Sequence, residues 1–121
     1  MSQDSITAGV DTTSVTTTFL LLDLANNQEK QELLYQEILE HVGDSTVAEH
    51  NLAKMRYLRA CLQESQRLNP AVFALTRTTQ VDMTLSGYNV PTNVNIVYPL
   101  MLTMKDPTQF PNPNEVFLML F

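Results

Sequence analysis

Residues 54–70 read KMRYLRACLQESQRLNP, and they decide what kind of fold the chain adopts. Apolar Met55, Leu58 and Leu62 recur at three- and four-residue spacing, which predicts one face of an amphipathic helix over about residues 54–68. Asn69-Pro70 ends this helix, because the residue before a proline is held away from helical geometry. A separate polar stripe of the same helix is formed by Arg56, Arg59, Gln63 and Arg67.

The sequence before this helix also predicts helices, since it holds no proline and, after Gly9, a single glycine, Gly43. We expect one helix over about residues 5–25 and a second over about 27–42, with Asn27 able to cap the second. Gly43 is expected to end that helix in the left-handed conformation. The water-facing side of the second helix is predicted to include Glu29, Lys30, Glu32 and Glu37.

The sequence changes character after Pro70, where valine, threonine and other strand-forming residues become frequent. Ser86-Gly87 is a candidate hairpin turn, and four prolines between positions 99 and 113 predict an irregular end. Short strands are expected near residues 74–79, 84–85, 88–90 and 94–97. We therefore expect a mainly helical α+β fold, with residues 1–69 helical and residues 70–121 β-rich and irregular.

Charge and cysteine content exclude several classes of function. Thirteen acidic against seven basic side chains give a net charge of −6, which argues against nucleic-acid binding because that needs a basic face. The single cysteine excludes a disulfide framework and a cysteine-based zinc site. No targeting signal is visible at the N-terminus, and the apolar run at 19–22 is far too short to cross a bilayer. Residues 54–67, with four bases and one acid, form a basic island in this acidic chain.

Residues 8–13, AGVDTT, are the first candidate site. A glycine inside a helix lowers its stability by about 1 kcal/mol relative to alanine, so Gly9 needs a reason. One reason is a local opening of the helix that exposes backbone and hydroxyl groups, where Asp11 and Thr12 could relay protons. The alternative is that Asp11 or Thr12 caps a helix N-terminus and the threonines face solvent.

Glu64 and Arg67 are the second candidate, because side chains three residues apart on a helix lie on one face and can pair. The alternative is an ordinary surface ion pair, which contributes about 0.2–0.5 kcal/mol. The basic island at 54–67 has a similarly plain alternative, a solvated helix face.

The order of these motifs along the chain is more specific than any one of them. AGVDTT is followed by Glu64-Ser65-Gln66-Arg67, Leu68-Asn69-Pro70, Arg77, SGYNVP at 86–91 and DPTQFPNP at 106–113. This set closely resembles the cytochrome P-450 family of haem-thiolate monooxygenases over nearly the whole chain. The resemblance implies that family's fold, haem as the cofactor, and insertion of one oxygen atom from O2 into a lipophilic or steroid-like substrate.

The resemblance also implies roles for single residues of the first candidate site. Asp11 and Thr12 match the acid–alcohol pair with which the family delivers protons for O–O cleavage. Ala8 and Gly9 match residues that line the groove for dioxygen beside the haem.

Further along the chain, Glu64 and Arg67 match a buried pair that helps to lock the core on the haem side. Arg77 matches an arginine that commonly binds a haem propionate. The family's axial cysteine lies in a glycine-rich loop, whereas Cys61 lies on the predicted helix, so no metal ligand is expected in this chain. We therefore expect a partial chain, without the N-terminal half and the cysteine loop, that is inactive alone.

Residues 8–14 (AGVDTTS) and 57–64 (YLRACLQE) are similar to the mitochondrial-type branch of the family, and to arthropod members in particular. The resemblance implies that electrons come from a small acidic ferredoxin, as in that branch. Arg59 matches one of the two basic residues with which the branch docks ferredoxin, and Gln63 stands in the place of the other. The basic island fits such a partner.

The resemblance thus implies a longer protein on the matrix side of the mitochondrial inner membrane, with the endoplasmic reticulum as the alternative and membrane association left open. The other interpretation is a non-catalytic relic, or a small interaction module derived from the family, because no cysteine loop is present.

Overall fold

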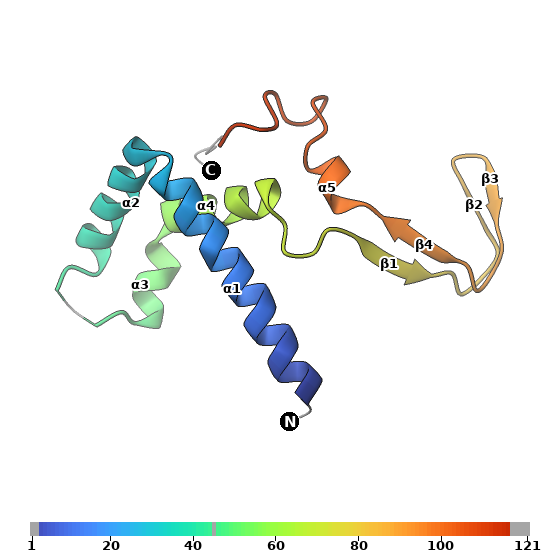
Figure 1. The fold of residues 1–121 in the computed structure, drawn as a ribbon, viewed down its shortest axis with the longest axis horizontal. Helices are drawn as coiled ribbons and strands as arrows, with labels where there is room; N and C mark the ends of the chain where they lie inside the picture. The colour runs from blue at the N-terminus through green and yellow to red at the C-terminus, as the bar shows by residue number, and fades with distance from the viewer. Residues whose placement is uncertain (1–2, 45, 117–121) are drawn as a thin grey trace.

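The computed structural model describes residues 3–44 and 46–116, with side chains described from Gly9 onward. It is mainly helical with two small antiparallel sheets, which confirms the expected α+β class. Figure 1 shows the long helices gathered at one end of the molecule and the strands leaving them as an extended arm. In chain order the elements are α1 (Gln3–Ala25), α2 (Gln28–His41), α3 (Glu49–Lys54), α4 (Arg56–Leu68), β1 (Leu75–Thr78), β2 (Met83–Leu85), β3 (Tyr88–Val90), β4 (Asn95–Tyr98) and α5 (Leu100–Thr103).

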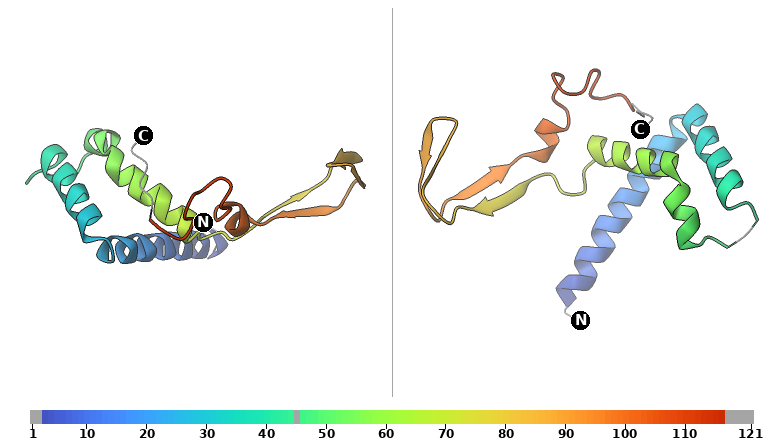
Figure 2. Two further views of the ribbon diagram at one scale, coloured as in Figure 1. Left: turned by 90° about the horizontal axis from the view of Figure 1, so that it is seen from above. Right: turned by 180° about the vertical axis from the view of Figure 1, so that it is seen from behind.

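Helices α1, α2 and α4 form the packed part of the molecule. Helix α4 contacts α1, and α2 contacts both of them (Figure 2). The buried apolar side chains of the described residues are Leu34 of α2, Met55 just before α4, and Cys61 and Leu68 of α4. These few side chains mark the place where the three helices meet, which is the scaffold of the candidate site.

The helices follow the predicted ranges, with differences at their ends. Helix α4 begins at Arg56, because the residues just before it form the separate short helix α3, which the sequence did not reveal. Asn51 stabilises α3 by accepting the N–H of the preceding N-cap residue at 3.0 Å. Asn27 stands at the N-cap of α2 as predicted, but its amide donates back to the Asp23 carbonyl at 2.8 Å and makes no cap bond. Gly43 has a φ of 57°, which confirms the left-handed end after α2.

The buried face of α4 differs from the predicted apolar stripe. Leu58 and Leu62 are only partly covered, whereas Cys61, Ser65 and Leu68 are buried. The reason lies in the packing, because α1 and α2 both lie against α4, and a polar serine on the covered face finds a hydrogen-bond partner on α1.

The four predicted strands are confirmed and form two ladders. Strand β1 pairs with β4, so that Arg77 lies opposite Ile96, and β2 pairs with β3. Ser86 and Gly87 between β2 and β3 have φ values of 49° and 85°, so the predicted hairpin turn is confirmed. The short helix α5 lies in the part of the chain that was expected to be irregular.

Thr79 lies between the two ladders of the arm and is only 4% exposed. Its backbone N–H donates to the Val94 carbonyl at 3.0 Å. Its hydroxyl donates to the Pro91 carbonyl at 2.7 Å and accepts the Val94 N–H at 2.9 Å. One threonine therefore fixes the point where the arm changes from one ladder to the other.

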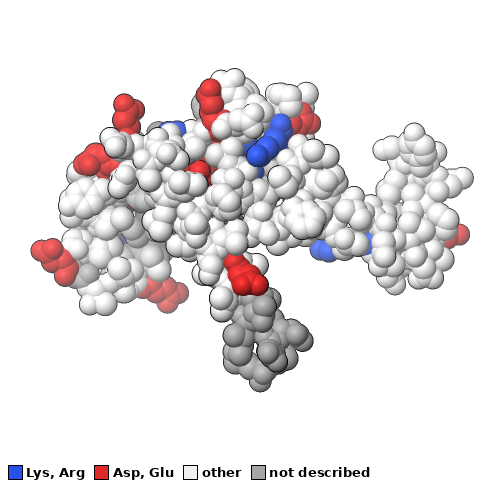
Figure 3. Space-filling model, viewed as in Figure 1, with Lys and Arg blue, Asp and Glu red and all other residues white. Residues whose placement is uncertain are grey.

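Charge is distributed unevenly over the described surface. Figure 3 shows acidic groups around the helical end, while the arm is almost free of charge apart from a basic group near its base and an acidic group near its tip. Among the described helices, none combines the length and the apolar character that crossing a bilayer requires.

Candidate functional site

Glu64 and Arg67 form a bidentate ion pair on α4. The Arg67 Nε lies 2.8 Å from Glu64 Oε2, and Nη2 lies 2.9 Å from Oε1. The side chains of Arg67 and Glu64 are only 9% and 11% exposed. A bidentate pair with so little contact with water is stronger and more directional than a solvated one. The alternative of an ordinary surface pair is therefore wrong.

The remaining donors of Arg67 reach a segment far along the chain. Its Nη1 donates to the carbonyls of Met104 and Pro113, both at 2.9 Å, and Nη2 donates to the Glu115 carbonyl at 3.1 Å. Its guanidinium also lies 4.9 Å from the centroid of the Phe110 ring, within cation–π range. Arg67 thus ties the irregular segment after α5 to α4.

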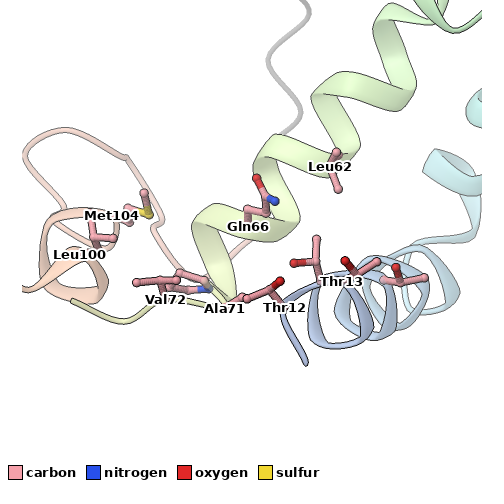
Figure 4. Close-up of a pocket in the computed structure, with 11 residues that line it drawn as sticks. Thr12, Thr13, Leu62, Gln66, Ala71, Val72, Leu100 and Met104 are labelled. Atoms are coloured by element: carbon pink, nitrogen blue, oxygen red, sulfur yellow. The ribbon is translucent and has the colours of Figure 1, made fainter. Parts of the chain in front are cut away.

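A groove of about 600 Å³ lies beside this pair, between α1, α4 and the segment that follows α4. Figure 4 shows Thr12 and Thr13 of α1 on one side of it and Leu62 and Gln66 of α4 on another. The residues that line it are Thr12, Thr13, Thr16, Thr17, Leu62, Gln66, Pro70, Ala71, Val72, Leu100 and Met104. A row of hydroxyl groups from one helix therefore faces a largely apolar wall.

The other residues of the first candidate site lie differently. Helix α1 runs unbroken through residues 8–13, so the expected local opening is not present in this structure. Asp11 is exposed and does not line the groove, because successive residues of a helix point about 100° apart. A Cβ added at Gly9 would meet open space, and the side chain of Ala8 lies outside the described residues. The helix-cap alternative is wrong, because Asp11 and Thr12 lie well inside α1.

The two candidate arginines outside the ion pair are both exposed. Arg77 lies on β1, and its Nη1 donates to the Thr76 carbonyl at 2.9 Å, so its guanidinium stays close to its own strand. Arg59 lies in the second turn of α4, away from the residues that line the groove. The structure does not bring either arginine to Thr12.

Cys61 is buried on α4, and its surroundings keep it protonated. Burial, reinforced by the negative charge of Glu37, raises the pKa of the Cys61 thiol to about 11. A thiolate is the form of cysteine that binds iron, and burial disfavours that form at Cys61. The described residues also contain no cluster of three or more histidine, cysteine or acidic side chains for a metal.

Sequence reasoning missed two polar contacts that fix α4. Both oxygens of the Glu37 carboxylate accept backbone N–H groups of α4, from Tyr57 at 2.8 Å and Leu58 at 2.9 Å. The Ser65 hydroxyl donates to Asp23 Oδ2 of α1 at 2.7 Å. Glu37, predicted to face water, is only partly exposed, because its carboxylate binds these two backbone groups. No local signal could have revealed these contacts, because their partners lie 20 to 42 residues apart.

Comparison with known proteins gives a consistent family. The chain matches the family described as Cytochrome P450 over residues 2–118. It is 42% identical over 117 residues to cytochrome P450 CYP12A2 of Musca domestica, which covers 95% of this chain and 22% of that protein. With the same coverage it is 40% identical to probable cytochrome P450 12a5, mitochondrial, of Drosophila melanogaster. It is also 40% identical over 113 residues to ent-kaurene oxidase-like 5 of Oryza sativa subsp. japonica, covering 93% and 22%.

These matches agree on one family. The chain belongs to the cytochrome P450 family, which confirms the resemblance seen in its motifs. Several similar insect proteins carry the word mitochondrial in their names. The chain spans about a fifth of the length of the curated relatives it matches, 20–22% in each.

Proposed function

We propose that this chain is part of a longer haem-thiolate monooxygenase that inserts one oxygen atom of O2 into a lipophilic substrate. Residues 1–69 and 70–121 are then the helical part and the β-rich part of one domain. The observation that carries the proposal is the groove, because Thr12 lines it together with apolar side chains of three other segments. The family membership supports the chemistry.

Within this chain, we assign proton handling to Asp11 and Thr12. The Thr12 hydroxyl holds a water molecule at the groove and relays protons to it, taking up one proton for each that it gives, and the exposed Asp11 is the neighbouring acid of this relay. We also carry over to Ala8 and Gly9, one turn earlier on α1, the family's role of lining the space for dioxygen. The pair therefore connects bulk water to a largely apolar space.

The haem, when bound, supplies the activation of O2, and this chain supplies part of its surroundings. Arg77 is the residue we assign to a propionate, since its guanidinium is exposed and an arginine suits a carboxylate. Glu64 and Arg67 keep the segment after α5 in place beside the groove.

We assign electron supply to an acidic ferredoxin that docks on the first turns of α4. Arg56 and Arg59 are exposed there, and the first turn of α4 holds no acidic residue. This surface is complementary to an acidic partner. The insect relatives named mitochondrial support a mitochondrial location, on the matrix side of the inner membrane.

A segment exchange tests the proposal. Residues 2–118 of this chain replace the aligned segment of the Musca domestica relative, giving a full-length exchange protein. We expect it to bind haem, to show the carbon monoxide spectrum of a thiolate-ligated haem, and to oxygenate a lipophilic probe substrate when ferredoxin is supplied. The unmodified housefly protein is the control. An exchange protein that binds haem but forms no product would instead support the interpretation of a non-catalytic relic.

A further inference from the structure

Helix α4 begins without a cap of its own. Its N-cap residue, Met55, makes no side-chain cap bond, and its first turn contains no acidic residue. The amide groups of a first helical turn have no partner inside the helix, and they give that end a partial positive charge. Arg56 and Arg59 add two full positive charges at the same end. An anion placed beside such a turn stabilises it.

Glu37 of α2 supplies that anion. Its two oxygens accept the N–H groups of Tyr57 and Leu58 at 2.8 and 2.9 Å, which are the second and third residues of α4. An N-cap side chain normally serves these same positions, so Glu37 replaces a local cap from 20 residues upstream. The carboxylate binds backbone amides, and the guanidinium groups of Arg56 and Arg59 stay exposed.

We propose that Glu37 is a positioning residue for electron-donor docking. It fixes the first turn of α4 against α2, and through that turn it holds Arg56 and Arg59 in the arrangement that an acidic partner recognises. The inference rests on the ferredoxin-dependent activity proposed above. When the turn frays, only the ordered fraction of molecules binds the donor, so the apparent affinity falls by that fraction.

Glu37→Gln in the exchange protein tests this inference. Glutamine keeps one carbonyl oxygen and replaces the other by a donor that faces an N–H group, so one of the two bonds is lost. We expect faster amide hydrogen exchange at Tyr57 and Leu58, and a rise of up to about tenfold in the KM for ferredoxin. The kcat at saturating ferredoxin should stay unchanged, because Glu37 is not among the residues that line the groove.

Glu40→Gln is the matched control, since Glu40 lies on the same helix, is exposed, and loses the same charge. A KM that rises equally in both variants would show a general charge effect and would overturn the inference. Unchanged exchange at Tyr57 and Leu58 in Glu37→Gln would also overturn it. If the unsubstituted exchange protein accepts no electrons from ferredoxin, the proposed donor fails, and amide exchange alone then decides whether Glu37 orders this turn.

Discussion

The helical end and the β arm are held together by contacts of different range. In the helical end, Arg67 bonds to carbonyls 37 to 48 residues away, and Ser65 bonds to Asp23, 42 residues away. In the arm, the side-chain bonds of Thr79 span 12 to 15 residues and stay within the arm. The helical end therefore depends on distant segments arriving together, whereas the arm depends on its own turns. Substituting one buried polar side chain in each region should show whether the helical end and the arm lose stability independently of each other.

The largest effect is expected at Arg67 in the helical end. Arg67→Ala removes the bidentate partner of a buried carboxylate and the donor to three carbonyls of the following segment. Breaking a buried pair in this way typically lowers stability by about 3–5 kcal/mol. Urea unfolding of the exchange protein, with and without the substitution, measures this loss of stability. Arg67→Lys is the control that keeps the charge without the planar fork, and it should recover only part of the loss. Equal stability of Arg67→Ala and the unsubstituted protein would contradict a role in joining distant segments.

A smaller and local effect is expected at Thr79 in the arm. Thr79→Val keeps the shape of the side chain but removes the hydroxyl that serves Pro91 and Val94. The expected loss is about 1–3 kcal/mol, confined to the arm. Amide hydrogen exchange should accelerate in residues 75–98 and stay unchanged in α1 and α4. Thr79→Ser keeps the hydroxyl, so amide hydrogen exchange in residues 75–98 should stay close to that of the unsubstituted protein. Faster exchange spreading into the helices would contradict the independence of the two regions.

The pH dependence of stability should report on the helical core through Cys61. The pKa of this thiol is raised from 9.0 to about 11, mainly by burial, so the unfolded chain loses its proton at lower pH than the folded chain. Stability therefore falls as the pH rises from 9 towards 11, by up to about 2 kcal/mol from this group. Urea unfolding at pH 8 and pH 10.5 should show a smaller difference in Cys61→Ala. An identical difference in both proteins would mean that the thiol titrates normally.

The smallest effect on stability is expected at Thr12, although its effect on activity is large. Thr12→Ala in exposed helix changes stability by only about 0.5 kcal/mol, because alanine is a good helix former. Proton delivery by a positioned group typically contributes about 10²–10⁴-fold, so product formed per reductant consumed should fall sharply. Asp11→Asn should slow the whole cycle instead. Thr18→Ala is the control, since Thr18 is exposed on α1 outside the groove. An unchanged ratio in Thr12→Ala would leave Thr12 as an ordinary helix residue.

Local signals in the sequence were sufficient for most elements. The hairpin turn at Ser86-Gly87, the left-handed Gly43 and the end of α4 before Pro70 each depend on the conformational preference of one or two residues. The motif order also identified the family, which the comparison over residues 2–118 confirms. The short helix α3 was missed because it lies against the start of α4, where one continuous helix was the simpler expectation.

The tertiary structure alone decided which backbone groups the buried Arg67 and the partly buried Glu37 bind. In the sequence, Arg67 cannot be told from Arg59, nor Glu37 from Glu40. Each of them lies on the charged side of an amphipathic helix. In the folded chain Arg67 and Glu37 bind backbone groups of other segments, while Arg59 and Glu40 are exposed. Helix periodicity predicts only how residues are arranged around one helix axis. The backbone partners of Glu37 and Arg67 lie 20 to 48 residues away in the sequence. Only the packing of those segments creates the contact, so no local pattern can specify it.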